Sequence, residues 1–168
     1  MTALVGLEGV VSPVVLRRAE EVSRRLAALG VPHALIGGLA VGVHGHPRAT
    51  KDVDFLVGDA AFERIHPLLV FRAELSGVVE VGAVDLLAIP SKRPGLVAVL
   101  GIPAPGALPV IPLPALVLMK LDADRPQDRA DVVALLRLGA DLGELRDFLG
   151  EHGPDLLARF GALVGEAL

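Results

Sequence analysis

The sequence predicts an α/β (α+β) protein: a small mixed β-sheet flanked by helices, with a helical C-terminal part. The first observation is the order of elements, because one helical pattern is followed by strand–helix–strand–helix–strand. The second is a change of character near residue 113, after which helical patterns follow one another. Hydrophobic residues make up 52% of the 168 residues, which suffices for a sizeable core. We therefore expect a single domain over residues 1–168, with a core over residues 12–111 and a helical part over residues 112–168.

Each element rests on a local pattern. Ser12 and Pro13 begin a helix over residues 14–29, because Ser caps helices and Pro is tolerated at their first position, and Gly30 ends it. Short apolar runs bounded by Gly and Pro predict strands. The expected strands are residues 32–36, 53–57, 84–89 and 96–100. The further helices expected are residues 39–43, 59–69, 114–124, 126–138, 142–149 and 154–168.

Composition excludes several classes of function. No cysteine is present, so disulfides, thiolate metal sites and cysteine nucleophiles are ruled out. Aromatic residues are only 3%, with no Trp or Tyr, which leaves few platforms for stacking single-stranded nucleic acid. The net charge of -4 argues against a protein that binds along nucleic acid without sequence preference.

The chain is expected to be cytoplasmic, with no membrane contact. Residues 1–11 include Glu8 and no basic residue, which is unlike a secretory signal. Residues 94–119 carry no charge but contain six prolines. Each interior proline costs a helix about 3 kcal/mol, so this run does not predict a spanning helix.

Asp52 and Asp54 are the first candidate site residues. Strand side chains alternate between faces, so Val53 and Phe55 are expected in the core while both carboxylates project together. Adjacent carboxylates repel one another unless a cation lies between them. Oxygen ligands of this kind suit Mg²⁺ or Mn²⁺. The alternative is a polar strand entrance in which Asp52 caps a turn.

Asp85 stands at the head of another apolar run, residues 84–89. A carboxylate there is costly unless it is paired or liganded. If this strand neighbours residues 53–57, Asp85 completes a metal site with Asp52 and Asp54, and it also has the chemistry to accept a proton from an attacking hydroxyl. Alone, it would be an ordinary exposed aspartate at a strand end.

Gly37 and Gly38 lie where a strand meets a helix. Glycine allows backbone to approach a phosphate closely, and a positive φ at Gly38 would also forbid a branched side chain. The alternative is a simple tight turn. Arg48, Thr50 and Lys51 precede the acidic pair and are candidates for contacting a triphosphate or a polynucleotide acceptor; the alternative is a solvated loop.

Other charged residues give weaker signals. His44 and His46 lie in a loop without the spacing of a zinc site. Lys92 and Arg93 indicate surface charge.

Lys120 is the only charge between Arg93 and Asp122. It follows an apolar run on a predicted helix, so a buried ammonium there requires a partner. The functional interpretation places it across a cleft from Asp52 and Asp54, where it would neutralise charge on the transferring phosphates of a nucleotide. Asp131 in the next helix would orient the ammonium or lie at the mouth of the same cleft. The alternative is a long stem along the core whose head reaches water.

These candidates form one combined pattern between about residues 31 and 137. Its first part comprises Gly37, Gly38, His44, Gly45, Arg48, Thr50, Asp52 and Asp54. Asp85 in Val-Asp-Leu-Leu is the second part, and the third comprises Lys120, Arg125, Asp128 and Asp131. The combination resembles the nucleotidyltransferase superfamily, in particular the Gly-Gly variants among minimal nucleotidyltransferases and AbiEii-type toxins.

The resemblance implies Mg²⁺-dependent transfer of a nucleotidyl group from a nucleoside triphosphate to a hydroxyl of RNA, protein or a small molecule. Asp52, Asp54 and Asp85 would hold metal, Asp85 would also be the base, and Gly37-Gly38 would cradle phosphate. A tRNA or protein acceptor and a cognate antitoxin are the candidate partners.

Two positions differ from the family's commoner pattern: Gly38 stands where Ser is usual, and Ile36 stands where AbiEii-type members often have Lys. A nucleotide- or partner-binding module with the same fold and little catalysis is therefore the second hypothesis. An unrelated Asp-x-Asp enzyme, such as a sugar-nucleotide glycosyltransferase, is the third. The upstream Gly-Gly and the short chain argue against that last alternative.

Overall fold

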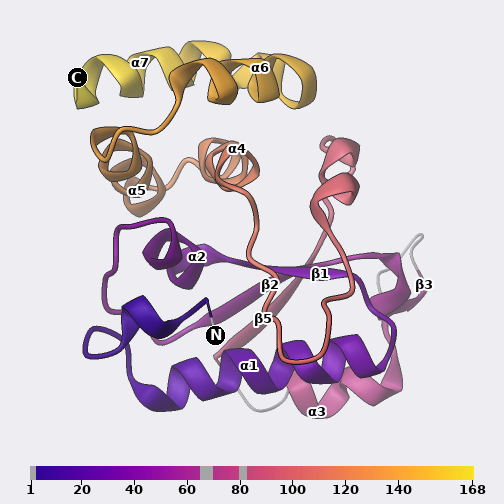
Figure 1. Cartoon of the computed structure of the whole chain (residues 1–168). Helices are drawn as coiled ribbons and strands as arrows, with labels where there is room; N and C mark the ends of the chain where they lie inside the picture. The colour runs from indigo at the N-terminus through magenta and orange to yellow at the C-terminus, as the bar shows by residue number, and fades with distance from the viewer. Residues whose placement is uncertain (1–2, 65–69, 80–82) are drawn as a thin grey trace.

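A computed structural model describes residues 3–64, 70–79 and 83–168. It shows a mixed α/β arrangement in which a small sheet lies between the long helix α1, Pro13–Ala28, and the C-terminal helices (Figure 1). A short 3-10 helix, η1 at Val5–Leu7, precedes α1. The predicted start and end of α1 are confirmed: the Ser12 hydroxyl accepts from the Val14 N–H at 3.3 Å, and Gly30 has a φ of +69°.

In the described ranges the main sheet has three strands, in the order β1-β2-β5. Strand β1 (His33–Ile36) pairs antiparallel with β2 (Val53–Val57), which pairs parallel with β5 (Val84–Ala88). These three strands confirm the predictions for residues 32–36, 53–57 and 84–89. Helix α2, Gly37–Val43, begins immediately after β1.

Strand alternation assigns the side chains of β2 to two cores. Val53 and Phe55 are fully buried in the core shared with α1, as predicted. Leu56 points the other way, into the core formed with the C-terminal helices. Asp54, two residues before Leu56, therefore lies on the face that these helices cover.

The helix predicted for residues 59–69 is wrong where the structure describes it. A 3-10 turn, η2 at Asp59–Ala61, leads into strand β3 at Phe62–Arg64, which pairs antiparallel with β4 at Val70–Phe71. Phe62 stacks on Phe71 with ring centroids 4.9 Å apart, and such a cross-strand aromatic pair favours the hairpin. The rest of the predicted helix, residues 65–69, lies outside the described residues.

After this hairpin come a 3-10 helix, η3 at Ala73–Leu75, and the single turn α3 at Ser76–Val79.

The strand predicted for residues 96–100 is also wrong. Pro94–Val99 form the 3-10 helix η4, which begins at a proline. Leu96 is fully buried whereas Val97 is 61% exposed, and Val99 and Leu100 are only partly buried, so this apolar run has one fully buried side chain where a buried strand would need more. After η4 the chain runs beside β1. Isolated β-bridges join Gly101 to His33 and Val110 to Leu35.

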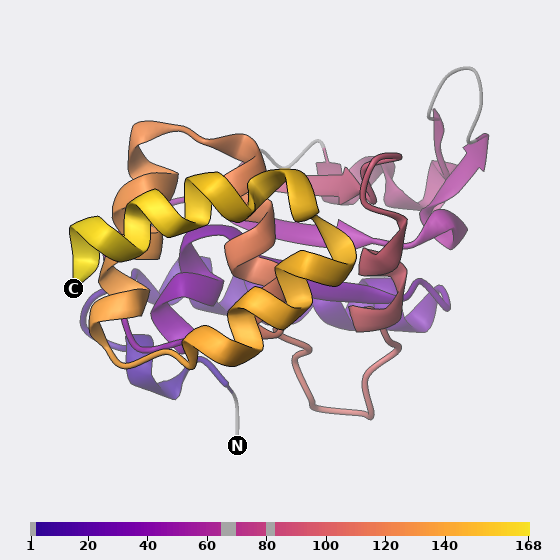
Figure 2. The same ribbon diagram turned by 90° about the horizontal axis from the view of Figure 1, so that it is seen from above.

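The predicted helices of the C-terminal part are confirmed. They are α4 (Leu113–Ala123), α5 (Pro126–Arg137), α6 (Leu142–His152) and, after the 3-10 turn η5 (Pro154–Leu156), α7 (Leu157–Ala167). Figure 2 shows α6 and α7 lying over α4 and the sheet. None of the helices in the described residues has the length and apolar character to cross a membrane.

Arg93, in the loop after β5, binds two carboxylates of the C-terminal helical part. It is buried, contrary to the expectation of surface charge. Its guanidinium donates to Asp155 at 2.7 and 2.8 Å and to Asp122 at 2.8 Å. These bonds join the loop, α4 and η5, because each carboxylate belongs to a different element.

Candidate functional site

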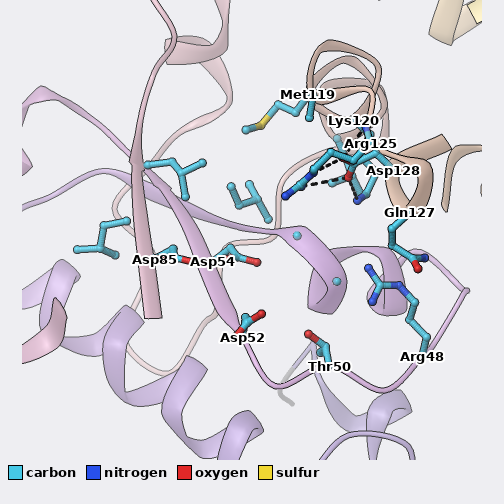
Figure 3. A pocket seen from close by; sticks show the side chains of 17 residues that line it. Arg48, Thr50, Asp52, Asp54, Asp85, Met119, Lys120, Arg125, Gln127 and Asp128 are labelled. Atoms are coloured by element: carbon cyan, nitrogen blue, oxygen red, sulfur yellow. Dashed lines mark hydrogen bonds and ion pairs between the residues drawn. The ribbon is translucent and has the colours of Figure 1, made fainter. Parts of the chain in front are cut away.

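A cleft of about 580 Å³ lies between α4 and the start of strands β2 and β5. Figure 3 shows Asp52, Asp54 and Asp85 on the sheet side, and Lys120, Arg125 and Asp128 together on the helix side. The lining residues are Ile36, Gly37, Gly38, Arg48, Thr50, Asp52, Asp54, Asp85, Leu86, Leu87, Leu116, Met119, Lys120, Ala123, Arg125, Gln127 and Asp128. The predicted site residues therefore line one cleft, apart from Asp131, which lies behind it against Lys120 and Arg48.

Asp54 and Asp85 are directly paired across the parallel strands β2 and β5. Neighbouring strands lie about 4.8 Å apart, so the two carboxylates project side by side from one face. Asp52 precedes β2 and is exposed at the same end of the cleft. The sheet thus gathers three acids that are up to 33 positions apart in the sequence.

The Asp54 carboxyl is both buried and close to two other acids. Burial raises its pKa first, and the negative charges of Asp85 and Asp52 raise it further, to about 6. Arg125 opposes this shift from across the cleft. A nearby cation would stabilise the ionised form of such a carboxyl.

The donor chemistry of the group fits Mg²⁺ or Mn²⁺. Asp52, Asp54 and Asp85 supply only oxygen ligands, which these hard cations prefer. Within the described residues, no three carboxylate or imidazole side chains converge closely enough to form a complete site as they stand. The three acids would hold a cation together with ligands from a substrate such as phosphate oxygens, which is the usual arrangement for Mg²⁺.

Gly37 and Gly38 pack against the site in different ways. Gly37 has a φ of +67°, and a Cβ there would lie 2.1 Å from Asp54 Oδ2. The positive φ considered for Gly38 thus occurs at Gly37. At Gly38 a Cβ would lie 3.2 Å from Thr50 Oγ1 and 3.3 Å from the Arg48 guanidinium nitrogens. The glycine pair therefore lets the Asp54 carboxylate and the Arg48 guanidinium approach the backbone.

Five charged residues of alternating sign form a chain along the helix side of the cleft. Arg48 Nε lies 2.9 Å from Asp131 Oδ1, and Asp131 Oδ2 lies 2.8 Å from Lys120 Nζ. Lys120 Nζ also lies 3.0 Å from Asp128 Oδ1, and Asp128 Oδ2 accepts from Arg125 Nε at 2.6 Å. This chain of charges links the loop before β2 to α4 and α5.

Lys120 occupies the middle of this chain, and its ammonium is buried between two carboxylates, so its head does not reach open water. Burial alone would raise the pKa of Asp131, but hydrogen bonds from Arg48, Lys120 and Gln127 outweigh it and hold that pKa below the ordinary value. The charge of Lys120 is thus largely neutralised, whereas the Arg125 side chain, 75% exposed, extends into the cleft.

Arg125, Gln127 and Asp128 also line the cleft. Arg125 and Asp128 were part of the family resemblance but had no predicted role in the site, and Gln127 was not predicted at all. Asp128 accepts from the Arg125 N–H at 3.3 Å as part of a capping box at the start of α5. Gln127 donates to Asp131 at 2.9 Å. Apart from the resemblance, the signal in the sequence was a cluster of opposite charges around residues 120–131, which by itself is typical of ordinary helix capping.

Three of the weaker candidates lie elsewhere. The His44 ring is bonded to the Ile111 carbonyl oxygen at 2.7 Å, which occupies one ring nitrogen in a structural contact. Neither His46 nor Lys51 is among the residues that line the cleft.

The cleft combines four carboxylates with three cationic side chains, a formal charge of -1 for the lining. A polyphosphate would gain little there from the protein's charges alone, and it would bind better with a divalent cation. Comparisons with models of known protein families and with curated proteins give no match to this chain.

Proposed function

We propose that this chain is a nucleotidyltransferase with a nucleotidyltransferase-type fold. The single observation that carries the proposal is the pairing of Asp54 with Asp85 on adjacent parallel strands, with Gly37 packed against the Asp54 carboxylate in the same cleft. This arrangement supports the sequence resemblance because it joins residues that the resemblance assigns to one site. The donor would be a nucleoside triphosphate, and the acceptor a hydroxyl of RNA, protein or a small molecule.

Each part of the cleft has a role in this proposal. Asp52, Asp54 and Asp85 would hold Mg²⁺ or Mn²⁺, which would neutralise phosphate charge and polarise the reacting phosphorus. Arg125 and Arg48 would contact phosphate oxygens, since arginine binds them through paired N–H groups. The acceptor oxygen would bond to the α-phosphorus, pyrophosphate would leave, and the hydroxyl proton would pass to Asp85.

Lys120 would be a positioning residue in this reaction. Its two ion pairs orient Asp128 and Asp131, which in turn hold Arg125 and Arg48 at the cleft. The cations nearest the phosphates would then be the arginines at the two ends of the chain of charges.

The second candidate is a nucleotide- or partner-binding module with weak catalysis. Two observations favour it: the Lys120 charge is already neutralised, and the three acids do not converge as they stand. Binding without transfer would distinguish this module from the enzyme.

The test begins with calorimetry of ATP and CTP in the presence of Mg²⁺, followed by transfer of labelled nucleotide to bulk tRNA and protein. Mn²⁺ should also raise the melting temperature, since a ligand of the folded state stabilises it by mass action. Combining Asp52→Asn with Asp54→Asn should abolish the Mn²⁺ effect and the transfer. Asp59→Asn, an exposed acid outside the cleft, is the matched control. An unchanged Mn²⁺ response in the double variant would refute the proposed metal site.

A further inference from the structure

Among the residues that the structure describes, strand β5 forms an open edge of the main sheet. In a parallel ladder, alternate residues direct their N–H and C=O groups to the same neighbour. The Val53 N–H donates to the Ala83 carbonyl oxygen at 2.8 Å, so residues 83, 85 and 87 face β2. The N–H groups of Leu86 and Ala88 therefore point away from β2. No backbone group in the described ranges bonds to them.

The opposite edge of the same sheet is covered. The N–H groups of His33 and Leu35 donate to Gly101 and Pro109 at 3.0 and 2.7 Å, and the Ile111 N–H donates to Leu35 at 3.0 Å. The proline-rich segment of residues 101–111 thus pairs with the outer edge of β1. An open edge offers a row of donors and acceptors that pairs with an extended chain. The fold therefore leaves unpaired, within the described residues, the edge that borders the cleft.

Side-chain alternation on β5 directs this edge toward the candidate active site. Asp85 and Leu87 share one face, both line the cleft, and Leu87 is 40% exposed. Val84 and Leu86 are buried on the other face. On an added antiparallel strand, the side chain opposite Asp85 would lie on the same face with Cβ atoms about 5 Å apart. A serine, threonine or tyrosine there would bring its hydroxyl beside the Asp85 carboxylate.

The remaining lining of the cleft offers little to a polynucleotide. Of the described residues that line it, none is aromatic, and their formal charge is -1. Polynucleotide binding depends mainly on cationic contacts and on stacking. Main-chain pairing on a sheet edge, in contrast, is a recurrent way of binding extended peptides.

We infer that the open edge of β5 docks an extended polypeptide segment and presents its hydroxyl side chain to Asp85. This inference rests on the proposed function and specifies its acceptor. The hydroxyl oxygen forms a bond to the α-phosphorus of the nucleoside triphosphate, and the bond from that phosphorus to pyrophosphate breaks. The proton of the hydroxyl passes to Asp85, and the products are a nucleotidylated protein and pyrophosphate.

The test uses nine-residue peptide pools with a central serine, threonine or tyrosine and randomised flanking positions, together with labelled ATP and Mg²⁺. Two further pools carry N-methyl groups on alternate residues. In the first pool, methyl groups replace the amide hydrogens that would point toward β5. In the second pool, they replace the amide hydrogens that would point away from β5. The expected result is labelling of the parent pool and of the second methylated pool, with at least tenfold less label on the first.

A protein variant tests the same edge from the other side. Ala88→Pro removes one outward N–H at the end of β5, where proline is tolerated because this N–H faces no other strand. Ala88→Ser keeps the N–H and is the matched control. Peptide labelling should fall at least tenfold in Ala88→Pro and persist in Ala88→Ser, while both bind Mg·ATP as the parent does. If Ala88→Pro does not fold, the two methylated pools decide the question.

The alternative outcomes are distinct. Label on tRNA but not on any peptide pool would overturn the inference and leave the proposed function standing. Equal labelling of the two methylated pools would show that peptides dock without the edge, which also overturns it. Absence of Mg·ATP binding by the parent protein would refute the proposed function itself.

Discussion

Arg48 and Asp131, 83 positions apart in the sequence, are joined by two hydrogen bonds of 2.9 and 3.0 Å from one guanidinium to one carboxylate. Asp131 is fully buried and also contacts Lys120 at 2.8 Å. This junction ties the loop before β2 to the C-terminal helices across the cleft. The position of Arg48 therefore depends on the correct packing of α4 and α5.

The first prediction concerns Lys120→Met, which keeps the stem but removes the charge. Asp128 and Asp131 would then share a buried site without their common cation, so unfolding free energy should fall by about 3 kcal/mol. Lys92→Met is the control, because Lys92 is 62% exposed and its pair with Asp122 should contribute at most about 1 kcal/mol. Urea denaturation measures both variants. Equal midpoints for Lys120→Met and the parent would show that the buried pairs contribute no net stability.

The second prediction follows from the raised pKa of Asp54. Its folded-state pKa of about 6 lies above the ordinary value of 3.8, so the unfolded chain ionises first as pH rises. The contribution of Asp54 to the stability of the metal-free protein is therefore lost between about pH 4 and pH 6. The free-energy difference between Asp54→Asn and the parent should grow in favour of the variant over this window. Asp59→Asn is the control, and a difference that does not vary with pH would contradict the assignment.

The third prediction concerns the buried His33. Its Nδ1–H donates to the Val31 carbonyl oxygen at 2.8 Å, so Nε2 is left to accept from the Ser23 hydroxyl at 2.7 Å. Burial lowers the pKa of His33 below 6.5, and the bond to Val31 opposes this only in part. Below pH 6.5 the unfolded state gains protons first, so stability is lost as pH falls.

Unfolding measured at pH 7.5 and pH 5.5 tests this assignment. The loss of stability due to His33 should disappear in His33→Gln and persist in His46→Gln. Comparing variants at the same pH cancels the contributions of the carboxylates. If His33→Gln loses as much stability between pH 7.5 and pH 5.5 as the parent does, another group is responsible.

The fourth prediction separates the two glycines of the cleft. Gly37→Ala places a methyl group 2.1 Å from Asp54 Oδ2 at a φ of +67°, so it should cost about 2 kcal/mol and disturb the acidic pair. Gly38→Ala meets only the softer contacts at 3.2 and 3.3 Å and should weaken nucleotide binding more than stability. Gly150→Ala in α6 meets no atom within 4 Å and should be slightly stabilising. Thermal unfolding with calorimetry of Mg·ATP distinguishes the three variants.

The sequence by itself determined most helices and the three strands of the main sheet. Proline and serine mark the start of α1, prolines mark α4 and α5, and apolar runs that end at a glycine mark β1 and β2. These signals lie within one or two turns of the chain, so they need no distant partner. The same locality explains the errors at residues 59–64 and 96–100. There, apolar residues fit more than one backbone conformation, and the Phe62–Phe71 contact and the burial of Leu96 decide which one forms.

The assembly of the cleft was decided only by the tertiary structure. The sequence selected Asp54 and Asp85, but their pairing depends on which strands are neighbours. Lys120 and Asp131 were also selected, whereas the burial of the ammonium between two carboxylates, and the place of Arg125 at the end of the chain of charges, require α4 and α5 to pack together. The residue types record which chemistry is available. Packing decides which charges neutralise one another and which still face the cleft.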